Sequence, residues 1–169
     1  MSTATFALVF GIAYLGAGLL GLIPAALMPP PADAPPTQLT LSYGYLLGLF
    51  PVNALHSAVH IAIGAWGLMA WRGQTSLQVY TRSLALFYGA LGVMGLIPGL
   101  NTLFGMLPLY GHDVWLHLGT ATVAAYFGWR EEVHPERRAM SDRRQRELPV
   151  GRERRFGLGD RRELSYGGA

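Results

Sequence analysis

Residues 48–72 read GLFPVNALHSAVHIAIGAWGLMAWR, and this stretch decides the fold. It is apolar enough to cross a bilayer, yet it contains two histidines, His56 and His60. Because these residues are four positions apart, both imidazoles lie on one face of a helix, one turn from each other. An ionisable side chain inside a membrane helix is costly and needs a partner, so the pair is a candidate functional site.

A second copy of this element follows later in the chain. Residues 103–130 read LFGMLPLYGHDVWLHLGTATVAAYFGWR. A shift of 57 residues aligns Pro51 with Pro108, His56 with Asp113 and His60 with His117. The segments GLIPA at 21–25 and GLIPG at 95–99 repeat at a shift of 74. The sequence therefore predicts two consecutive helical hairpins of the same design, with His60 and His117 at equal depth.

The composition favours an integral membrane protein. The chain of 169 residues is 51% hydrophobic and only 14% charged, whereas soluble domains average about 25% charged residues. The absence of cysteine excludes disulfides, thiolate zinc sites and thiol nucleophiles. All 13 basic residues are arginines, and 11 of them lie in the last 40 residues, so a nearly uncharged body precedes an arginine-rich tail.

The expected fold is an all-α integral membrane protein with four transmembrane helices. Crossing a bilayer takes about 17–25 helical residues, and the segments that reach this length are 6–27, 46–71, 84–104 and 109–129. The transmembrane domain is expected to cover residues 1–130, and the tail, 131–169, is expected to be flexible. The proline-rich loop at 29–45 cannot continue a helix and is expected to contain a short interfacial segment.

Arginine placement predicts the orientation of the chain. Arg72, Arg82 and the tail arginines fall on one side of the expected membrane, and the opposite loops contain no basic residue. The positive-inside rule then predicts a multi-pass protein of the inner membrane with both termini in the cytoplasm.

Four side chains of the second and fourth helices are the candidate site residues. His56, His60, Asp113 and His117 offer three imidazoles and a carboxylate, which suit Zn²⁺ or Fe²⁺. Alternatively, His60 and His117 alone could be the axial ligands of a b-type haem. A third interpretation is structural, with hydrogen bonds across helices and with Asp113 and Asn53 capping their helices. A proton or solute pathway is the fourth, and the sequence leaves all of them open.

The remaining polar and small residues indicate contacts with other molecules and within the bundle. His112 adjoins an outer loop and His134 lies in the tail, so both are expected to be solvated. Glycines of the first and third spans allow close helix approach, either within the chain or between copies. The tail arginines would attract anionic lipid headgroups, whereas no folded motif accompanies them that would indicate nucleic acid as a partner.

Several motifs together resemble a known family. They are GLFPVN at 48–53 with His56 and His60, GLIPG at 95–99, TLFG at 102–105 and DVWLH at 113–117. The chain resembles, over about residues 4–130, a bacterial family of four-helix membrane proteins, the domain of unknown function 4383. His112 stands where asparagine is expected in that family, which argues against a ligand role for it. The resemblance implies the membrane fold, but no activity.

Two functions follow from these observations. The first is a non-enzymatic accessory or interaction subunit that associates with itself or with a larger membrane complex, since no nucleophile–base arrangement is recognisable. The alternative is a metal- or haem-binding redox or transport protein that uses the histidine pair of the second and fourth helices. The alternative predicts that the imidazoles of His60 and His117 converge on a common point.

Overall fold

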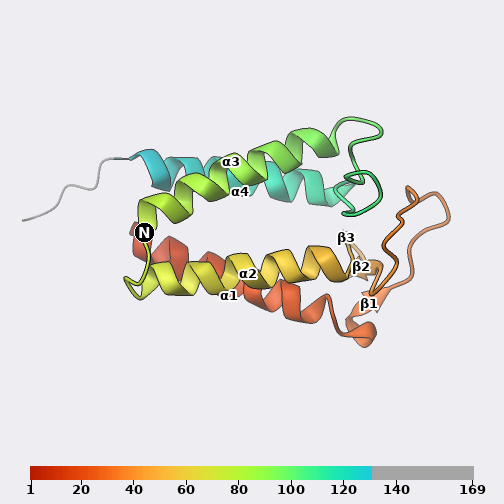
Figure 1. The fold of residues 1–169 in the computed structure, drawn as a ribbon, viewed down its shortest axis with the longest axis horizontal. Coiled ribbons are helices and arrows are strands. Elements are labelled where there is room, and N and C mark those ends of the chain that lie inside the picture. The colour runs from red at the N-terminus through yellow and green to blue at the C-terminus, as the bar shows by residue number, and fades with distance from the viewer. Residues whose placement is uncertain (131–169) are drawn as a thin grey trace, which may run out of the picture. The chain divides into compact units, whose positions relative to one another are not determined.

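Four long helices make up most of the described chain. The structure, a computed structural model, describes residues 1–130, so the predicted arginine-rich tail lies outside the described residues. The helices are α1 (Thr3–Leu20), α2 (Ala54–Trp71), α3 (Leu77–Gly95) and α4 (His112–Trp129). Figure 1 shows α1 paired with α2 and α3 paired with α4, in two layers. The expected four-helix, mostly helical architecture is confirmed.

A small sheet at one end of the bundle was not predicted. A short 3₁₀ helix (Pro24–Ala26) leads into β1 (Leu27–Met28), which pairs antiparallel with β2 (Gly44–Leu46), and β2 pairs with β3 (Phe50–Val52). The expectation of an all-α chain was therefore incomplete. Prolines keep the long first loop out of the helical conformation, and pairing two- and three-residue strands satisfies part of its backbone.

The helices differ in their bounds from the predicted spans. α3 begins at Leu77 because the Ser76 hydroxyl accepts the Val79 N–H at 3.3 Å, and it ends at Gly95, before Pro98. The third span, predicted at 84–104, was thus placed too late at both ends. Among residues 1–130, α1 and α2 are long and apolar enough to cross a membrane, with mean hydropathies of 1.8 and 1.2.

Glycines bring the two helices of each hairpin together in the same way. A Cβ on Gly18 of α1 would lie 2.7 Å from the Ile61 side chain of α2, and a Cβ on Gly92 of α3 would lie 2.6 Å from Leu118 of α4. Gly18 and Gly92 are related by the shift of 74, and Ile61 and Leu118 by the shift of 57. The internal repeat in the sequence is thus also a repeat of contacts, and the glycine faces serve packing within the chain.

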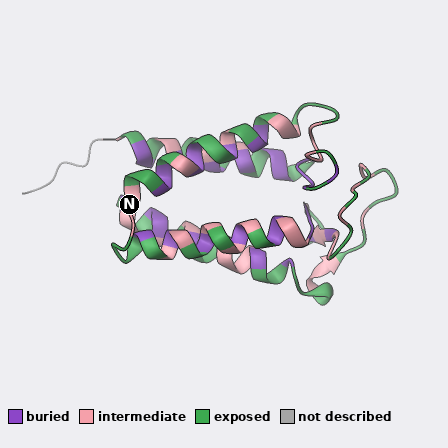
Figure 2. Ribbon diagram, in the orientation of Figure 1, coloured by how far each residue is buried: buried purple, intermediate pink, exposed green. Residues whose placement is uncertain are grey.

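The interior between the hairpins has two different halves. Figure 2 shows the buried residues on the helix faces that point toward the other hairpin. Near the N-terminus of α1, aromatic rings fill the space, with centroids of Phe6 and Phe10 4.2 Å apart and those of Phe6 and Phe127 4.8 Å apart. We call this the aromatic half. Toward the sheet the interior also contains buried polar side chains, and we call this part, defined by His56, His60, Asp113 and His117, the histidine half.

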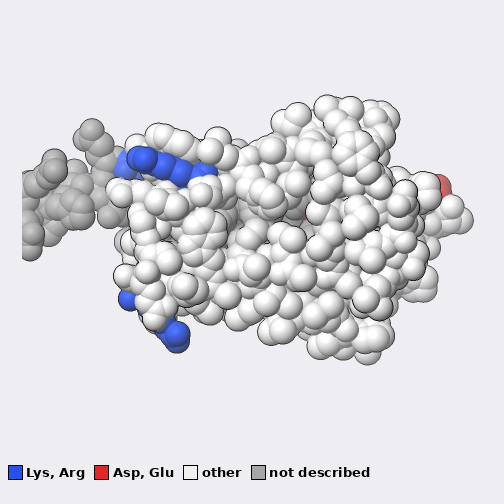
Figure 3. Space-filling view, in the orientation of Figure 1, with Lys and Arg blue, Asp and Glu red and all other residues white. Residues whose placement is uncertain are grey.

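Charged residues mark the end of the bundle opposite the sheet. The basic residues of the described chain are Arg72, Arg82 and Arg130, and Figure 3 shows blue atoms gathered at one end of the molecule. There the Arg82 Nε donates to the Gly128 carbonyl at 2.9 Å, and its guanidinium lies 5.5 Å from the Trp129 ring centroid. These contacts tie the second turn of α3 to the last turn of α4.

Tyrosines join the loops at the sheet end. The hydroxyls of Tyr43 and Tyr110 share a short hydrogen bond between the first and last loops. Burial raises the pKa of the neighbouring Tyr45 hydroxyl above its ordinary value. Tyrosine hydroxyls thus join the loops at the sheet end, whereas the arginines lie at the other end.

Candidate metal centre

Three buried histidines meet in the histidine half of the bundle. His56 and His60 come from consecutive turns of α2, and His117 comes from α4. Their exposed fractions are 3%, 6% and 1%, respectively. Each ring offers a nitrogen, and the three nitrogens lie within 4.8 Å of one another. The sequence offered these histidines as candidate ligands, among other interpretations, and the fold brings all three together.

Hydrogen bonds of the Asn53 side chain fix the start of α2 and thereby position His56. The Asn53 side chain caps the helix by accepting the His56 N–H at 2.9 Å, as the sequence predicted. The Asn53 amide also donates to the carbonyls of Leu39 at 3.2 Å and Met106 at 2.8 Å. The Asn53 side chain therefore joins the start of α2 to the loops of both hairpins. These hydrogen bonds fix where α2 begins, and with it the positions of His56 and His60.

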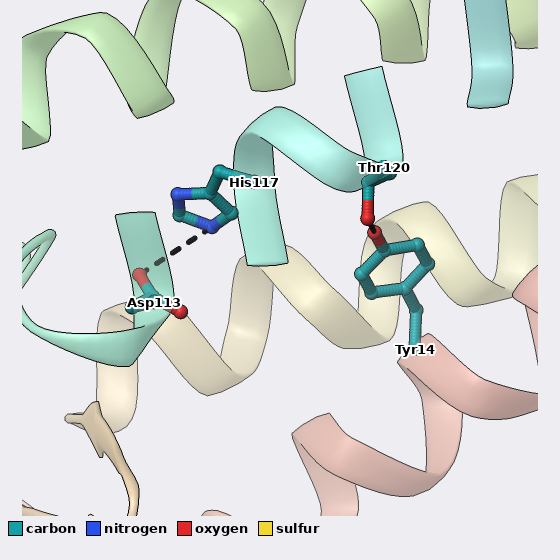
Figure 4. A network of polar contacts seen from close by, with 4 residues as sticks. All are labelled: Tyr14, Asp113, His117 and Thr120. Carbon is teal, nitrogen blue, oxygen red and sulfur yellow. Dashed lines mark hydrogen bonds and ion pairs between the residues drawn. The ribbon is translucent and has the colours of Figure 1, made fainter. Parts of the chain in front are cut away.

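Asp113 lies behind His117 and does not cap α4. Its Oδ2 is 3.5 Å from the His117 Nε2, and both side chains are 1% exposed (Figure 4). The residue at the cap position is Gly111, and α4 has no side-chain cap. The capping role that the structural interpretation gave to Asp113 is therefore wrong. A carboxylate that contacts one nitrogen of a histidine orients the ring so that the other nitrogen can bind a metal.

Several polar atoms of this centre are buried without a hydrogen bond. In the described part of the chain they are His56 Nδ1, both ring nitrogens of His117, and Asp113 Oδ2. A buried polar group left unpaired costs about 1–3 kcal/mol, so such groups rarely gather without a reason. A cation bound between the rings would give one nitrogen of each imidazole a partner.

Two tyrosines flank the centre, and the sequence analysis did not find them. The Tyr14 ring centroid is 5.2 Å from that of His60, and the Tyr88 centroid is 5.0 Å from that of His117. The two tyrosine rings stack on each other at 5.1 Å, and the Tyr14 hydroxyl donates to Thr120 Oγ1 at 2.9 Å (Figure 4). Extending the GLIPA/GLIPG repeat backward by the shift of 74 aligns Tyr14 with Tyr88, so the repeat contained the signal.

A small cavity lies against all three histidines. Its volume is about 10 Å³, the room that one water-sized group needs. The rest of its wall is made by Val59, Phe87, Tyr88, Leu91, Leu107 and Leu109. A haem would need a pocket of about 300 Å³ or more. The cavity is therefore far too small to hold a haem between His60 and His117.

The other predicted histidines take no part in the centre. His112 is exposed at the start of α4, as expected for a solvated residue. His134 lies outside the described residues. The candidate site is therefore limited to the three buried histidines and Asp113.

Comparison with known proteins identifies the family of the bundle. The family model named domain of unknown function (DUF4383) matches residues 4–130. The chain belongs to this family. No curated protein and no solved structure matches the chain. The DUF4383 match covers α1 to α4 together with the histidines of the centre, and its description assigns no activity.

Proposed function

We propose that this DUF4383 protein is a multi-pass membrane protein that binds one divalent transition-metal ion at His56, His60 and His117. The observation that supports it is the meeting of three buried imidazoles from both hairpins, with nitrogens within 4.8 Å. The two candidate functions differ in whether the imidazoles converge on one point. A metal-binding protein requires convergence, whereas the histidines of an accessory subunit would only bond to helix neighbours. The geometry therefore favours the metal-binding alternative.

The distribution of polarity supports a membrane location for all four helices. Large apolar side chains are exposed along the bundle, including Val9, Ile12, Leu86, Val93 and Trp115, with exposed fractions from 48% to 69%. The charged side chains of the helices, Asp113 apart, lie at the arginine end (Figure 3). Apolar surface of this extent marks a membrane or protein contact. The arginine end would then face the cytoplasm, with both termini, and the tail arginines would meet anionic headgroups.

The ligand set narrows the class of metal. Imidazole nitrogen suits Zn²⁺, Cu²⁺, Fe²⁺ and Ni²⁺, whereas Mg²⁺ and Ca²⁺ prefer oxygen ligands. Zinc–nitrogen bonds of about 2.0–2.1 Å place tetrahedral ligands about 3.4 Å apart. The histidine nitrogens lie within 4.8 Å of one another. Small rotations of the rings would bring these nitrogens to the spacing that a tetrahedral ion requires.

Asp113 supplies the charge that such a site needs. A dication held by three neutral imidazoles would keep its full charge inside an apolar bundle, which is costly. Asp113 is the only buried acidic residue of the described chain, and it contacts His117. Its carboxylate lowers the net charge of the loaded centre and holds His117 in place.

Metal analysis of the full chain, produced without a histidine tag, tests the proposal. The protein would be extracted from washed membranes with detergent, incubated with Zn²⁺, desalted and analysed for metal. We expect about one ion per chain for the wild type, and loss of the ion in His60→Ala and His117→Ala. His112→Ala is the matched control, because this histidine is exposed, and it should keep the ion.

Two results would contradict the proposal. One is a wild-type protein, folded by circular dichroism and monodisperse in detergent, that holds no metal. The other is a His60→Ala/His117→Ala protein that keeps as much metal as the wild type. Recovery of the chain in the soluble fraction would contradict the membrane assignment separately.

A further inference from the structure

Arg82 is held in a fixed position at the arginine end of the bundle. Its Nε donates to the Gly128 carbonyl of α4 at 2.9 Å, and its guanidinium lies over the Trp129 ring, 5.5 Å from the ring centroid. A Cβ on Gly128 would lie 3.0 Å from the Arg82 Cγ, so the missing side chain at this position lets the arginine pack against α4. Two contacts and a glycine therefore orient this side chain, although it is exposed.

The outer edge of the Arg82 guanidinium has no partner in the bundle. A guanidinium carries five N–H donors, and Arg82 uses the one on Nε. Within residues 1–130, no hydrogen bond or ion pair reaches its two Nη atoms. The acidic residues of this part of the chain are Asp33, in the long loop at the sheet end, and Asp113, buried beside His117. The Nη donors and the charge of Arg82 are therefore available to a ligand from outside the bundle.

The other two arginines of the described chain differ from Arg82. The Arg130 Nη2 donates to Thr3 Oγ1 at 3.4 Å, and its guanidinium lies 4.5 Å from the Phe127 ring centroid. Arg72, at the end of α2, is exposed, and its side chain makes no hydrogen bond or ring contact with residues 1–130. Arg72 thus offers the same charge as Arg82 without a fixed orientation.

The surroundings of Arg82 indicate the phosphate of a lipid as the ligand. The edge of a guanidinium matches two oxygens of a phosphate, and both hydrogen bonds are strengthened by charge. Trp129 is 54% exposed and Tyr126 is 63% exposed, and aromatic side chains of this kind lie at headgroup level in membrane proteins. In the proposed membrane location, the arginine end (Figure 3) meets the cytoplasmic headgroups, where each phospholipid presents a phosphodiester.

We propose that Arg82, oriented by the Gly128 carbonyl and the Trp129 ring, binds the phosphate of an anionic phospholipid through its Nη edge. This inference rests on the proposed membrane location and does not depend on metal binding. A side chain that is already oriented loses less conformational entropy when a ligand binds, so one lipid is held at this site in preference to the general surface. An anionic lipid is favoured over a zwitterionic one because no headgroup cation offsets the charge of its phosphate.

Lipid binding to the full chain tests this inference. The protein would be purified in neutral detergent, stripped of lipid and titrated with phosphatidylglycerol, and the bound lipid would be counted by native mass spectrometry. We expect Arg82→Gln to lower the affinity for the tightest-bound lipid by about tenfold, equal to about 1.4 kcal/mol. Arg82→Lys should also lower it, because an ammonium keeps the charge but lacks the planar fork.

Arg72→Gln is the matched control. It removes one positive charge from the same end of the bundle, and the affinity should stay within about twofold of the wild type. Circular dichroism should show the same helix content in all variants. Equal losses in Arg82→Gln and Arg72→Gln would overturn the oriented site, and so would an Arg82→Lys protein that binds as tightly as the wild type.

The other outcomes concern the identity of the ligand. Phosphatidylcholine that binds as tightly as phosphatidylglycerol would overturn the anionic class. Inorganic phosphate that displaces the lipid at equal concentration would identify a free anion as the ligand. Lipid binding that appears only in a Glu131→Gln/Glu132→Gln protein would show that carboxylates of the tail occupy the edge.

The failure of this inference is distinguishable from the failure of the proposed function. Recovery of the chain in the soluble fraction would overturn the membrane location on which the inference rests. A chain that binds lipid through Arg82 but holds no metal would overturn the metal centre alone. A chain that holds metal but no lipid would overturn the Arg82 site alone.

Discussion

The aromatic half and the histidine half of the bundle are built on the same four helices but filled in opposite ways. In the aromatic half, rings stack at 4.2 and 4.8 Å, and Phe6 is fully buried. In the histidine half, three imidazoles and several apolar side chains line a cavity of about 10 Å³, and several imidazole nitrogens have no hydrogen bond in the described chain. The difference indicates that the aromatic half holds the hairpins together, whereas the histidine half contains the proposed metal site.

The internal repeat shows where the two hairpins contribute equivalent side chains to the histidine half and where they differ. The pairs Tyr14–His60 and Tyr88–His117 are equivalent by the shifts of 74 and 57, and their ring distances agree, at 5.2 and 5.0 Å. The equivalence fails one turn away, where His56 of the first hairpin corresponds to Asp113 of the second. A symmetric scaffold thus carries an asymmetric centre, with the extra imidazole on one side and the carboxylate on the other.

The largest expected effect comes from emptying part of the aromatic half. Phe6→Ala removes a ring that stacks on both Phe10 and Phe127, so we expect a loss of about 3 kcal/mol in the free energy of unfolding in detergent. Denaturant titration followed by circular dichroism measures it. Ile12→Ala, at a position that is 58% exposed, is the control and should change stability by less than about 0.5 kcal/mol. The folded Phe6→Ala protein should still bind one ion per chain, and loss of metal from it would contradict the separation of the two halves.

A smaller effect is expected from neutralising the carboxylate of the histidine half. Asp113→Asn keeps the shape of the side chain but removes the charge beside His117, so we expect zinc affinity to fall by about 10–100-fold. That loss equals about 1.4–2.7 kcal/mol. Competition with a chromophoric chelator measures the affinity, and Asp33→Asn, at an exposed site, should match the wild type. An unchanged affinity in Asp113→Asn would show that Asp113 has no part in metal binding.

The smallest effect is expected where the two halves meet. Tyr14→Phe removes the buried hydrogen bond to Thr120, of 2.9 Å, while keeping the ring against His60, so stability should fall by about 1 kcal/mol. Tyr126→Phe, at a position that is 63% exposed, should have no measurable effect. Thermal unfolding in detergent compares the two variants. Metal content should be unchanged in both, and a Tyr14→Phe protein without metal would place the hydroxyl in the site.

Local sequence patterns determined most of the architecture. Apolar runs predicted four helices, prolines excluded a helix from the loop at 29–45, and Asn53 could be recognised as a cap because its residue type and position suit one. The proximity of His56 and His60 follows from the period of the helix alone. The third span was misplaced because hydropathy located its most apolar part, whereas the helix starts at the cap residue, Ser76.

Only the tertiary structure decided how the two hairpins face each other. A helical period says which residues share a face of one helix, but the partner of that face depends on packing between segments far apart in the chain. The arrival of His117 beside the α2 histidines, the place of Asp113 behind it and the stacked pair of Tyr14 and Tyr88 all depend on that packing. The sequence alone therefore determined which residues could form the centre, and the docking of the hairpins selected three of the four as a converging group.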